Sequence, residues 1–184
     1  MKIGVLALQG AFREHRLMVE RCGVEAVEVR KPDDLAAVDG LIIPGGESTT
    51  IGKLLNDWKL MEPIKARAAA GMAIFGTCAG LILLAKDIAG SDQPRLGLMD
   101  ITAARNAFGR QRESFEAALT VPELGSEPII AVFIRAPLIE KADPAVQILA
   151  TVGGKPVLAR QGNLLVASFH PELTDDDRIH RYFI

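Results

Sequence analysis

Few side chains in this sequence could act as nucleophile, base or metal ligand. The chain of 184 residues has two cysteines and three histidines: Cys22, Cys78, His15, His170 and His180. No Cys and His pair has the spacing of a metal-binding motif, so we expect neither a metal nor another cofactor. Any catalysis is expected to rest on a cysteine nucleophile that a histidine assists.

Cys78 lies at the centre of a glycine-flanked pentapeptide, Gly76-Thr77-Cys78-Ala79-Gly80. This spacing is typical of a nucleophile elbow, in which glycines allow a sharp turn from strand to helix and expose the central side chain at the carboxyl edge of a sheet. The N-terminus of the following helix would favour a thiolate. A cysteine that only packs in a core needs no such glycines, so we interpret Cys78 as the nucleophile and Cys22 as a core residue.

A His-Pro-Glu triplet beginning at His170 supplies a base. It follows a predicted strand at 164–168, and Glu172 lies two residues after the histidine, so both side chains project to the same side. The carboxylate can then orient the imidazole, as in a catalytic triad. A histidine that merely ends a strand is the alternative. His15 and His180 lie on predicted helices, on a mixed face and in an exposed turn, and are interpreted as structural.

A glycine pair, Gly45-Gly46, ends another predicted buried strand and precedes the start of a helix. Backbone N–H groups near Gly46, together with the N–H of Ala79, are expected to face a developing oxyanion. Ser48 lacks the second glycine of an elbow and is interpreted as the cap of the helix rather than as a nucleophile.

Charged residues near predicted strand ends suit a zwitterionic substrate. The guanidinium groups of Arg105 and Arg135 can hold a carboxylate, and Glu47 can hold an ammonium group. Arginines of this kind are equally typical of solvated loops, so their role depends on what the fold brings together.

The first half of the chain alternates between two kinds of predicted element. The strands are 3–8, 27–29, 41–43 and 72–75, and the helices are 12–22, 48–58, 63–70 and 79–88. Gly23 and Gly71 are expected to end two of the helices. Repeated β-α-β units imply a mostly parallel sheet covered by helices on both faces, which is a three-layer α/β sandwich.

The second half is predicted to contain strands joined by turns. The strands are 98–103, 115–121, 129–134, 146–152, 156–160 and 164–168. Gly153-Gly154 and Gln161-Gly162 are the predicted hairpin turns, so antiparallel strands are expected here. Thr174 is predicted to cap a last helix whose first turn is 175–177. Because there is no linker or repeat, residues 1–184 are interpreted as one domain.

Composition narrows the class of protein. Hydrophobic residues make up 49% and charged residues 24%, and 21 basic against 23 acidic residues give a net charge of −2. Such a charge provides no field for nucleic acid or an anionic membrane. Apolar runs such as 129–134 are far shorter than the roughly 18 residues of a membrane span, and the first residues have no signal-peptide layout. We therefore expect a cytoplasmic protein that handles a small polar substrate or a protein partner.

Taken together, six segments resemble the glutaminase subunits of pyridoxal 5′-phosphate synthase, a family of triad-type (class I) glutamine amidotransferases. They are 6–10, 44–50, 76–80, 105–111, 133–137 and 168–173. The elbow and the His-Pro-Glu triplet are shared by triad amidotransferases, whereas 105–111 and the Gly-Glu-Ser-Thr-Thr run are specific to this subunit.

The resemblance implies a flavodoxin-like class I amidotransferase fold and hydrolysis of L-glutamine to glutamate and ammonia through a cysteine thioester. It also implies a hetero-oligomeric complex with a synthase subunit, which uses the ammonia to make pyridoxal 5′-phosphate (vitamin B6). The implied catalytic residues are Cys78, His170 and Glu172. The implied glutamine contacts are Gly46, Glu47, Ser48, Arg105, Ile134 and Arg135, and Gln9 is implied as a partner contact.

Two other functions stay open at this stage. One is a glutaminase that serves another synthase, such as the one making imidazole glycerol phosphate. The other is a DJ-1-like cysteine stress protein, in which Cys78 would sense oxidation without turnover. The carboxylate two residues after His170 argues against the second.

Overall fold

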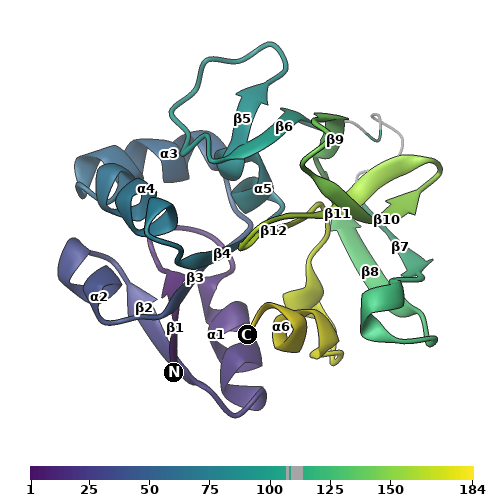
Figure 1. The fold of residues 1–184 in the computed structure, drawn as a ribbon, viewed down its shortest axis with the longest axis horizontal. Helices are drawn as coiled ribbons and strands as arrows, with labels where there is room; N and C mark the ends of the chain where they lie inside the picture. Colours follow the sequence, from purple (N-terminus) through teal and green to yellow (C-terminus); the bar gives the residue numbers. More distant parts are fainter. Residues whose placement is uncertain (107, 109–113) are drawn as a thin grey trace.

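A computed structural model describes residues 1–106, 108 and 114–184 (Figure 1). Its main element is a seven-stranded sheet with the order β10-β11-β12-β4-β3-β1-β2. The strands are β1 (Lys2–Leu6), β2 (Glu25–Val29), β3 (Gly40–Ile43), β4 (Ala73–Thr77), β10 (Gln147–Val152), β11 (Lys155–Gln161) and β12 (Leu164–Ala167). The run from β12 to β2 is parallel, and β10, β11 and β12 pair antiparallel. The predicted mixed α/β sheet is confirmed.

Helices cover both faces of this sheet (Figure 1). They are α1 (Phe12–Arg21), α2 (Pro32–Ala36), α3 (Ser48–Asp57), α4 (Met61–Ala69), α5 (Ala79–Leu84) and α6 (Arg178–Phe183). Buried residues of α2 to α5 share one hydrophobic cluster, and those of α1 and α6 share the other. Every residue of β3 is buried, as expected for a strand between two layers.

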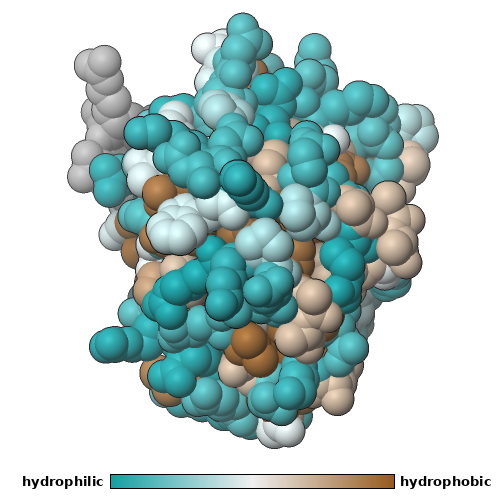
Figure 2. Space-filling view, turned by 90° about the vertical axis from the view of Figure 1, so that its left-hand side faces the viewer, coloured by the Kyte–Doolittle hydropathy of each residue, from teal (hydrophilic) through white to brown (hydrophobic). Residues whose placement is uncertain are grey.

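On one side of the molecule, where helices cover the sheet, the surface is mostly hydrophilic. Figure 2, which shows the side of the molecule at the left of Figure 1, is mostly hydrophilic with scattered hydrophobic residues. The helices therefore direct their apolar sides inward, as amphipathic patterns predict. In the described part of the chain, no helix is long and apolar enough to cross a membrane.

Within the described residues, two smaller sheets and two short 3-10 helices accompany the main sheet. One sheet joins β5 (Ala85–Ile88), β6 (Met99–Ala104) and β9 (Leu138–Ala142), and the other pairs β7 (Ser114–Leu119) with β8 (Ile129–Ile134). The 3-10 helices are η1 (Pro122–Leu124) and η2 (Pro171–Leu173). The pair β7–β8 contributes to the same hydrophobic cluster as α1 and α6.

The predicted turn glycines are confirmed where the backbone turns left-handed. Gly23 and Gly71 have φ values of +81° and +97° just after α1 and α4. Gly153 and Gly154, with φ values of +56° and +75°, join β10 to β11, and Gly162 at +57° joins β11 to β12. Only residues without a Cβ adopt these angles readily.

The predicted helix 79–88 is wrong beyond Leu84. Residues 85–88 form β5, which pairs with β6 and places Ala85 opposite Met99. A short apolar run fits a buried helix or a strand equally well, and here the pairing partner decides. Helix α2 and strand β9 were not predicted from the sequence.

The predicted cap of the last helix is wrong as well. α6 begins at Arg178, and its N-cap is Asp177. The Thr174 hydroxyl donates to the carbonyl oxygen of Pro171 (3.1 Å) and accepts from the N–H of Asp176 (3.3 Å). Thr174 therefore stabilises a turn between η2 and α6, because hydroxyl side chains compete for backbone groups in turns as well as at caps.

Candidate active site

Cys78 occupies the turn between β4 and α5, as the elbow motif predicted. Its φ of +50° lies in the left-handed region, which is uncommon for a residue other than glycine. A Cβ on Gly76 would lie 2.6 Å from the backbone of Gly80, and a Cβ on Gly80 would clash with the carbonyl oxygen of Ile43. The turn therefore requires glycine at both flanking positions.

Neighbouring strands bring His170 to Cys78. β12 is the parallel neighbour of β4, with Ala167 opposite Thr77, so the carboxyl ends of both strands meet at one edge of the sheet. The N–H of Cys78 donates to the carbonyl oxygen of Ala167 at 2.8 Å, and the N–H of His170 donates to that of Val132 at 2.8 Å. The two residues meet because the sheet places their strands side by side.

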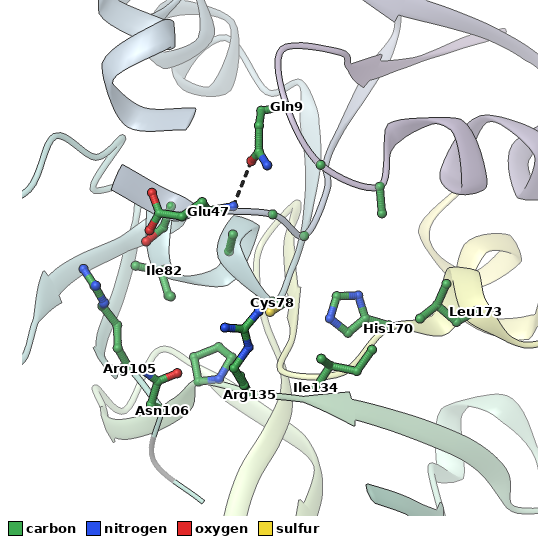
Figure 3. A pocket seen from close by; sticks show the side chains of 17 residues that line it. Gln9, Glu47, Cys78, Ile82, Arg105, Asn106, Ile134, Arg135, His170 and Leu173 are labelled. Atoms are coloured by element: carbon green, nitrogen blue, oxygen red, sulfur yellow. Dashed lines mark hydrogen bonds between the residues drawn. The ribbon is translucent and has the colours of Figure 1, made fainter. Parts of the chain in front are cut away.

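Cys78 and His170 lie near each other in the site (Figure 3), and Glu172 completes a triad-like series. His170 Nδ1 lies 2.7 Å from Glu172 Oε1, and both side chains are buried. Burial opposes the charged imidazole, but hydrogen bonds to Cys78 and Glu172 and their negative charges raise the pKa of His170 to about 10. Burial would also raise the pKa of Glu172, but the imidazoles of His15 and His170 lower it overall. The site therefore favours an imidazolium beside an ionised carboxylate.

A cavity of about 520 Å³ opens beside this triad. Every residue that was placed in the site from the sequence lines it except Glu172, whose carboxylate lies against His170 Nδ1. The cavity is also lined by Gly45, from the predicted glycine pair, and by residues to which the sequence assigned no individual role: Gly10, Ala11, Ile82, Asn106, Pro137 and Leu173. A Cβ on Gly45 would lie 2.5 Å from His170 Cε1 and 3.3 Å from Cys78 Cβ, so the first glycine of the pair leaves room for the imidazole.

The glycine-pair loop is held by the segment after β1. The Ala11 N–H donates to the carbonyl oxygen of Gly45 at 2.9 Å, and the Glu47 N–H donates to Gln9 Oε1 at 2.8 Å (Figure 3). The carbonyl of Gly45 and the N–H of Gly46 belong to the same trans peptide, so they point in opposite directions. Since the carbonyl points toward Ala11, the N–H of Gly46 points away from Ala11. Gln9 thus contacts the predicted oxyanion loop within this chain.

Glu47 caps α3, and the predicted capping by Ser48 is wrong. The Glu47 carboxylate accepts from the Thr50 N–H (2.8 Å), from the Thr50 hydroxyl (3.0 Å) and from the Thr49 hydroxyl. The hydrogen bonds from Thr49 and Thr50 outweigh burial and lower the pKa of Glu47 to about 2. Ser48 is the first helical residue, and its hydroxyl donates to Gln93 Oε1 at 3.4 Å. An ionised carboxylate is therefore fixed at the cavity wall.

Gln93 links two predicted substrate contacts and was missed by the sequence analysis. Its Oε1 accepts from Arg105 Nη1 at 2.6 Å as well as from Ser48. Gln93 lies between β5 and β6 in a segment without a motif, so no sequence signal marks it. The segment 105–111 begins in the cavity wall, but within it residues 107 and 109–111 lie outside the described residues.

Ile134 and Arg135 approach the cavity from the end of β8. The side chain of Ile134 is partly exposed, and Arg135 has a φ of +42°. This left-handed turn follows directly on the strand. Among the described residues, no group of three or more His, Cys, Asp or Glu side chains could hold a metal ion.

His15 and His180, predicted to be structural, lie behind the triad. The predicted exposed position of His180 is wrong: both imidazoles are fully buried, because α1 and α6 pack together against the sheet. His15 Nδ1 lies 2.8 Å from His180 Nε2, and His15 Nε2 lies 2.9 Å from Thr77 Oγ1. Cys22 is partly exposed, and burial raises the pKa of its thiol.

Comparison with known proteins agrees with this geometry. The model of the SNO glutamine amidotransferase family matches residues 5–184. The chain belongs to the SNO glutamine amidotransferase family. It is 64% identical to the pyridoxal 5′-phosphate synthase subunit PdxT of Carboxydothermus hydrogenoformans, over 100% of this chain and 96% of the relative. It is 63% identical to PdxT of Pelotomaculum thermopropionicum, over 100% of this chain and 94% of the relative.

Solved structures place this amidotransferase in the same fold. A crystal structure of a glutamine amidotransferase superposes with a TM-score of 0.94 at 53% identity, covering 98% of this chain and 96% of that one. PurLQS from Thermotoga maritima superposes with a TM-score of 0.72 at 18% identity, covering 99% of this chain and 96% of that one. The second likeness shows a shared fold.

Proposed function

We propose that this amidotransferase is the glutaminase subunit of a pyridoxal 5′-phosphate synthase. It hydrolyses L-glutamine to L-glutamate and ammonia, and the ammonia serves vitamin B6 synthesis. The names of its relatives, which are 58–64% identical over the whole chain, support this function. The observation that carries the chemistry is the cavity lined by Cys78 and His170, with the Glu172 carboxylate bound to His170.

Cys78 and His170 would carry out the reaction in two halves. The Cys78 thiolate attacks the side-chain amide carbon, and the His170 imidazolium gives its proton to the leaving nitrogen, so that the C–N bond breaks and ammonia departs. His170 then takes a proton from water, and the resulting hydroxide attacks the thioester carbon and expels the thiolate. Glu172 keeps the imidazole oriented and stabilises its charge.

The oxyanion formed in each half would be held by backbone donors. The N–H groups of Gly46 and Ala79 belong to residues that line the cavity beside Cys78. One such donor typically contributes about 3 to 4 kcal/mol to lowering the barrier. Because these donors belong to the backbone, they need no side-chain reorganisation during the reaction.

The cavity wall is complementary to a free amino acid. Arg105 and Arg135 would hold its carboxylate, and Glu47, fixed in its ionised form, would hold its ammonium group. Ser48 and Ile134 would complete the contact with the glutamine stem. Both charges of a zwitterion are thereby paired.

Ammonia release provides the direct test. We expect the chain, mixed with the pyridoxal 5′-phosphate synthase subunit, to release ammonia from glutamine, and we expect Cys78→Ala to abolish the release. Release that depends instead on an imidazole glycerol phosphate synthase subunit would show that another synthase is served. Persistent turnover by Cys78→Ala would rule out the cysteine mechanism, and oxidation of Cys78 without turnover would favour a stress protein.

The partner is proposed to contact Gln9. Because Gln9 Oε1 holds the N–H of Glu47, a partner that engages this segment would act on the oxyanion loop. A hetero-oligomeric complex with the synthase subunit is therefore expected to raise glutaminase activity. Gln9→Ala should weaken this activation, and an unchanged response to the partner would remove Gln9 from the interface.

Two broader expectations belong to the same proposal. Residues 1–184 act as one domain, since strands from both halves of the chain share one sheet. We also propose a cytoplasmic location, because both cysteines are free and a thiolate nucleophile needs a reducing compartment. Cell fractionation with an antibody to the chain tests the location.

A further inference from the structure

A second imidazole faces the triad carboxylate from the side opposite His170. Glu172 Oε1 is bound to His170, and in the described part of the chain no hydrogen bond reaches Glu172 Oε2. His15 Nε2 lies 3.4 Å from that oxygen, and all three side chains are buried. The outer oxygen of a buried carboxylate needs a donor, and His15 is placed to supply one.

The hydrogen-bonding pattern decides which nitrogen of His15 carries the proton. If Nδ1 carried it, Nδ1 would donate to His180 Nε2, and the proton on His180 Nδ1 would be buried without a partner. In addition, the lone pair of His15 Nε2 would face the Glu172 carboxylate. If Nε2 carries it, the N–H faces Thr77 Oγ1 and Glu172 Oε2, and only an acceptor on His180 is left unpaired. The second arrangement is favoured, because an unpaired buried donor and a lone pair against a carboxylate are both costly.

Both of these histidines are neutral. Burial lowers the pKa of His15, an effect that the carboxylates of Glu172 and Glu14 oppose and the imidazole of His170 reinforces. Burial, together with His15, places the pKa of His180 well below its ordinary value. A neutral imidazole can orient a carboxylate without competing with His170 for the ion pair.

We propose that His15 is a positioning residue that holds the Glu172 carboxylate, and through it His170, in the geometry required for catalysis. His180 fixes the tautomer of His15 by donating to its Nδ1. The hydrogen bond between His15 and Thr77 ties this support to the residue that precedes Cys78. Residues that orient metal ligands typically change affinity or activity about 10- to 100-fold when removed, and we expect an effect of that order for a residue that orients Glu172. The proposal rests on the glutaminase function given above.

Kinetics of two variants test the proposal. His15→Leu replaces the imidazole with an apolar side chain of similar size and so removes the N–H donor. His15→Gln places an amide N–H donor within similar reach of Glu172. With the synthase subunit present, we expect His15→Leu to lower kcat about tenfold with little change in KM, and His15→Gln to recover most of the loss. The acid limb of the kcat/KM profile should move to higher pH in His15→Leu alone, because the ionised form of Glu172 loses a donor.

Val19→Ala is the matched control, because Val19 lies on the same helix as His15 and is also fully buried. It should lower the melting temperature and leave kcat and the acid limb unchanged. If His15→Leu changed only the melting temperature, His15 would be merely structural and the proposal would fail. If the wild-type complex released no ammonia, the proposed function would fail instead.

Nuclear magnetic resonance of the free chain tests the tautomers independently of activity. The chain has only three histidines, so ¹⁵N labelling gives three imidazoles that single substitutions assign. We expect His15 to be neutral at pH 7 and above, with its proton on Nε2. A proton on Nδ1, or titration near the ordinary pKa of histidine of about 6.5, would overturn the proposal even if every variant failed to fold.

Discussion

At the scale of single residues, His170 differs in charge from the other two histidines. His170 is held as an imidazolium by Cys78 and Glu172, while the other two histidines are buried and neutral. The difference follows from partners rather than residue type: burial opposes the charge on all three, but hydrogen bonds to Cys78 and Glu172 raise the pKa of His170. Burial alone would have left all three uncharged.

The state of His170 predicts the alkaline side of the pH profile. Protonation of departing ammonia requires the imidazolium, and with a pKa of about 10 that form persists through pH 9. We therefore expect kcat/KM to stay constant up to about pH 9 and to fall at higher pH. Glu172→Gln removes a negative charge that raises the pKa of His170, so its alkaline limb should lie at lower pH. An unshifted limb in Glu172→Gln would show that the carboxylate does not set the charge of His170.

Gln93 predicts a separate effect on substrate binding. Gln93→Leu removes the acceptor that positions Arg105 and Ser48, so we expect KM for glutamine to rise about tenfold with kcat nearly unchanged, the size of one hydrogen bond to a charged group. Initial-rate measurements over a range of glutamine concentrations check this. Gln147→Leu, which removes an exposed contact with Glu123, is the control and should change neither constant.

At the scale of elements, the site is an edge where strand ends and helix starts meet. β4 delivers Cys78, β12 delivers the segment that carries His170, and β3 delivers the glycine pair. These are adjacent strands of one parallel sheet, so their carboxyl ends converge. The close approach of α5 to β3 at Gly80 shows how little space separates these elements.

This close approach predicts a large effect of one added methyl group. Gly80→Ala would push a Cβ against the carbonyl oxygen of Ile43, so we expect a loss of about 1 to 3 kcal/mol of unfolding free energy and of most glutaminase activity. In Gly23→Ala nothing lies near the new Cβ, so the variant should lose only about 1 to 2 kcal/mol of unfolding free energy, the amount by which alanine disfavours a left-handed backbone. Its activity should be unchanged. Urea unfolding and ammonia assays compare the two. Equal activity of both variants would contradict this account of the elbow.

At the scale of the whole molecule, the sheet interleaves the two ends of the chain. β1 and β12 lie on either side of the pair β3–β4, and α6 packs in the same hydrophobic cluster as α1. The proposed nucleophile, Cys78, comes from the first half, and its proposed base, His170, comes from the second. The halves therefore cannot separate without dismantling the site.

This interleaving predicts a single cooperative unfolding transition. The chain has one tryptophan, Trp58 after α3, and one tyrosine, Tyr182 in α6, which report on opposite halves. Fluorine labels on the two rings, followed by nuclear magnetic resonance in urea, should give coincident midpoints that also match far-ultraviolet circular dichroism. Separate midpoints would indicate two independently folding units.

Much of the site was predictable because its signals are local. The glycines around Cys78 and the pair Gly45-Gly46 are recognisable as motifs in consecutive positions, although contacts that require them, such as Gly80 with Ile43, come from distant segments. The alternating pattern of strands and helices likewise predicted the parallel sheet. Residues 85–88 and Thr174 were misassigned, because a short apolar run and a hydroxyl cap each fit two local structures, and tertiary pairing chooses between them.

The sequence alone indicated which residues can react, because the elbow around Cys78 and the His-Pro-Glu triplet each consist of consecutive residues. Only the tertiary structure decided that Glu47 rather than Ser48 caps α3, that Gln93 holds Arg105, and that His15 stands behind Glu172. Each of these last two contacts joins separate elements. The physical reason is that charge and hydrogen bonding depend on distance in space, which the packing of β4, β12, α1 and α6 sets.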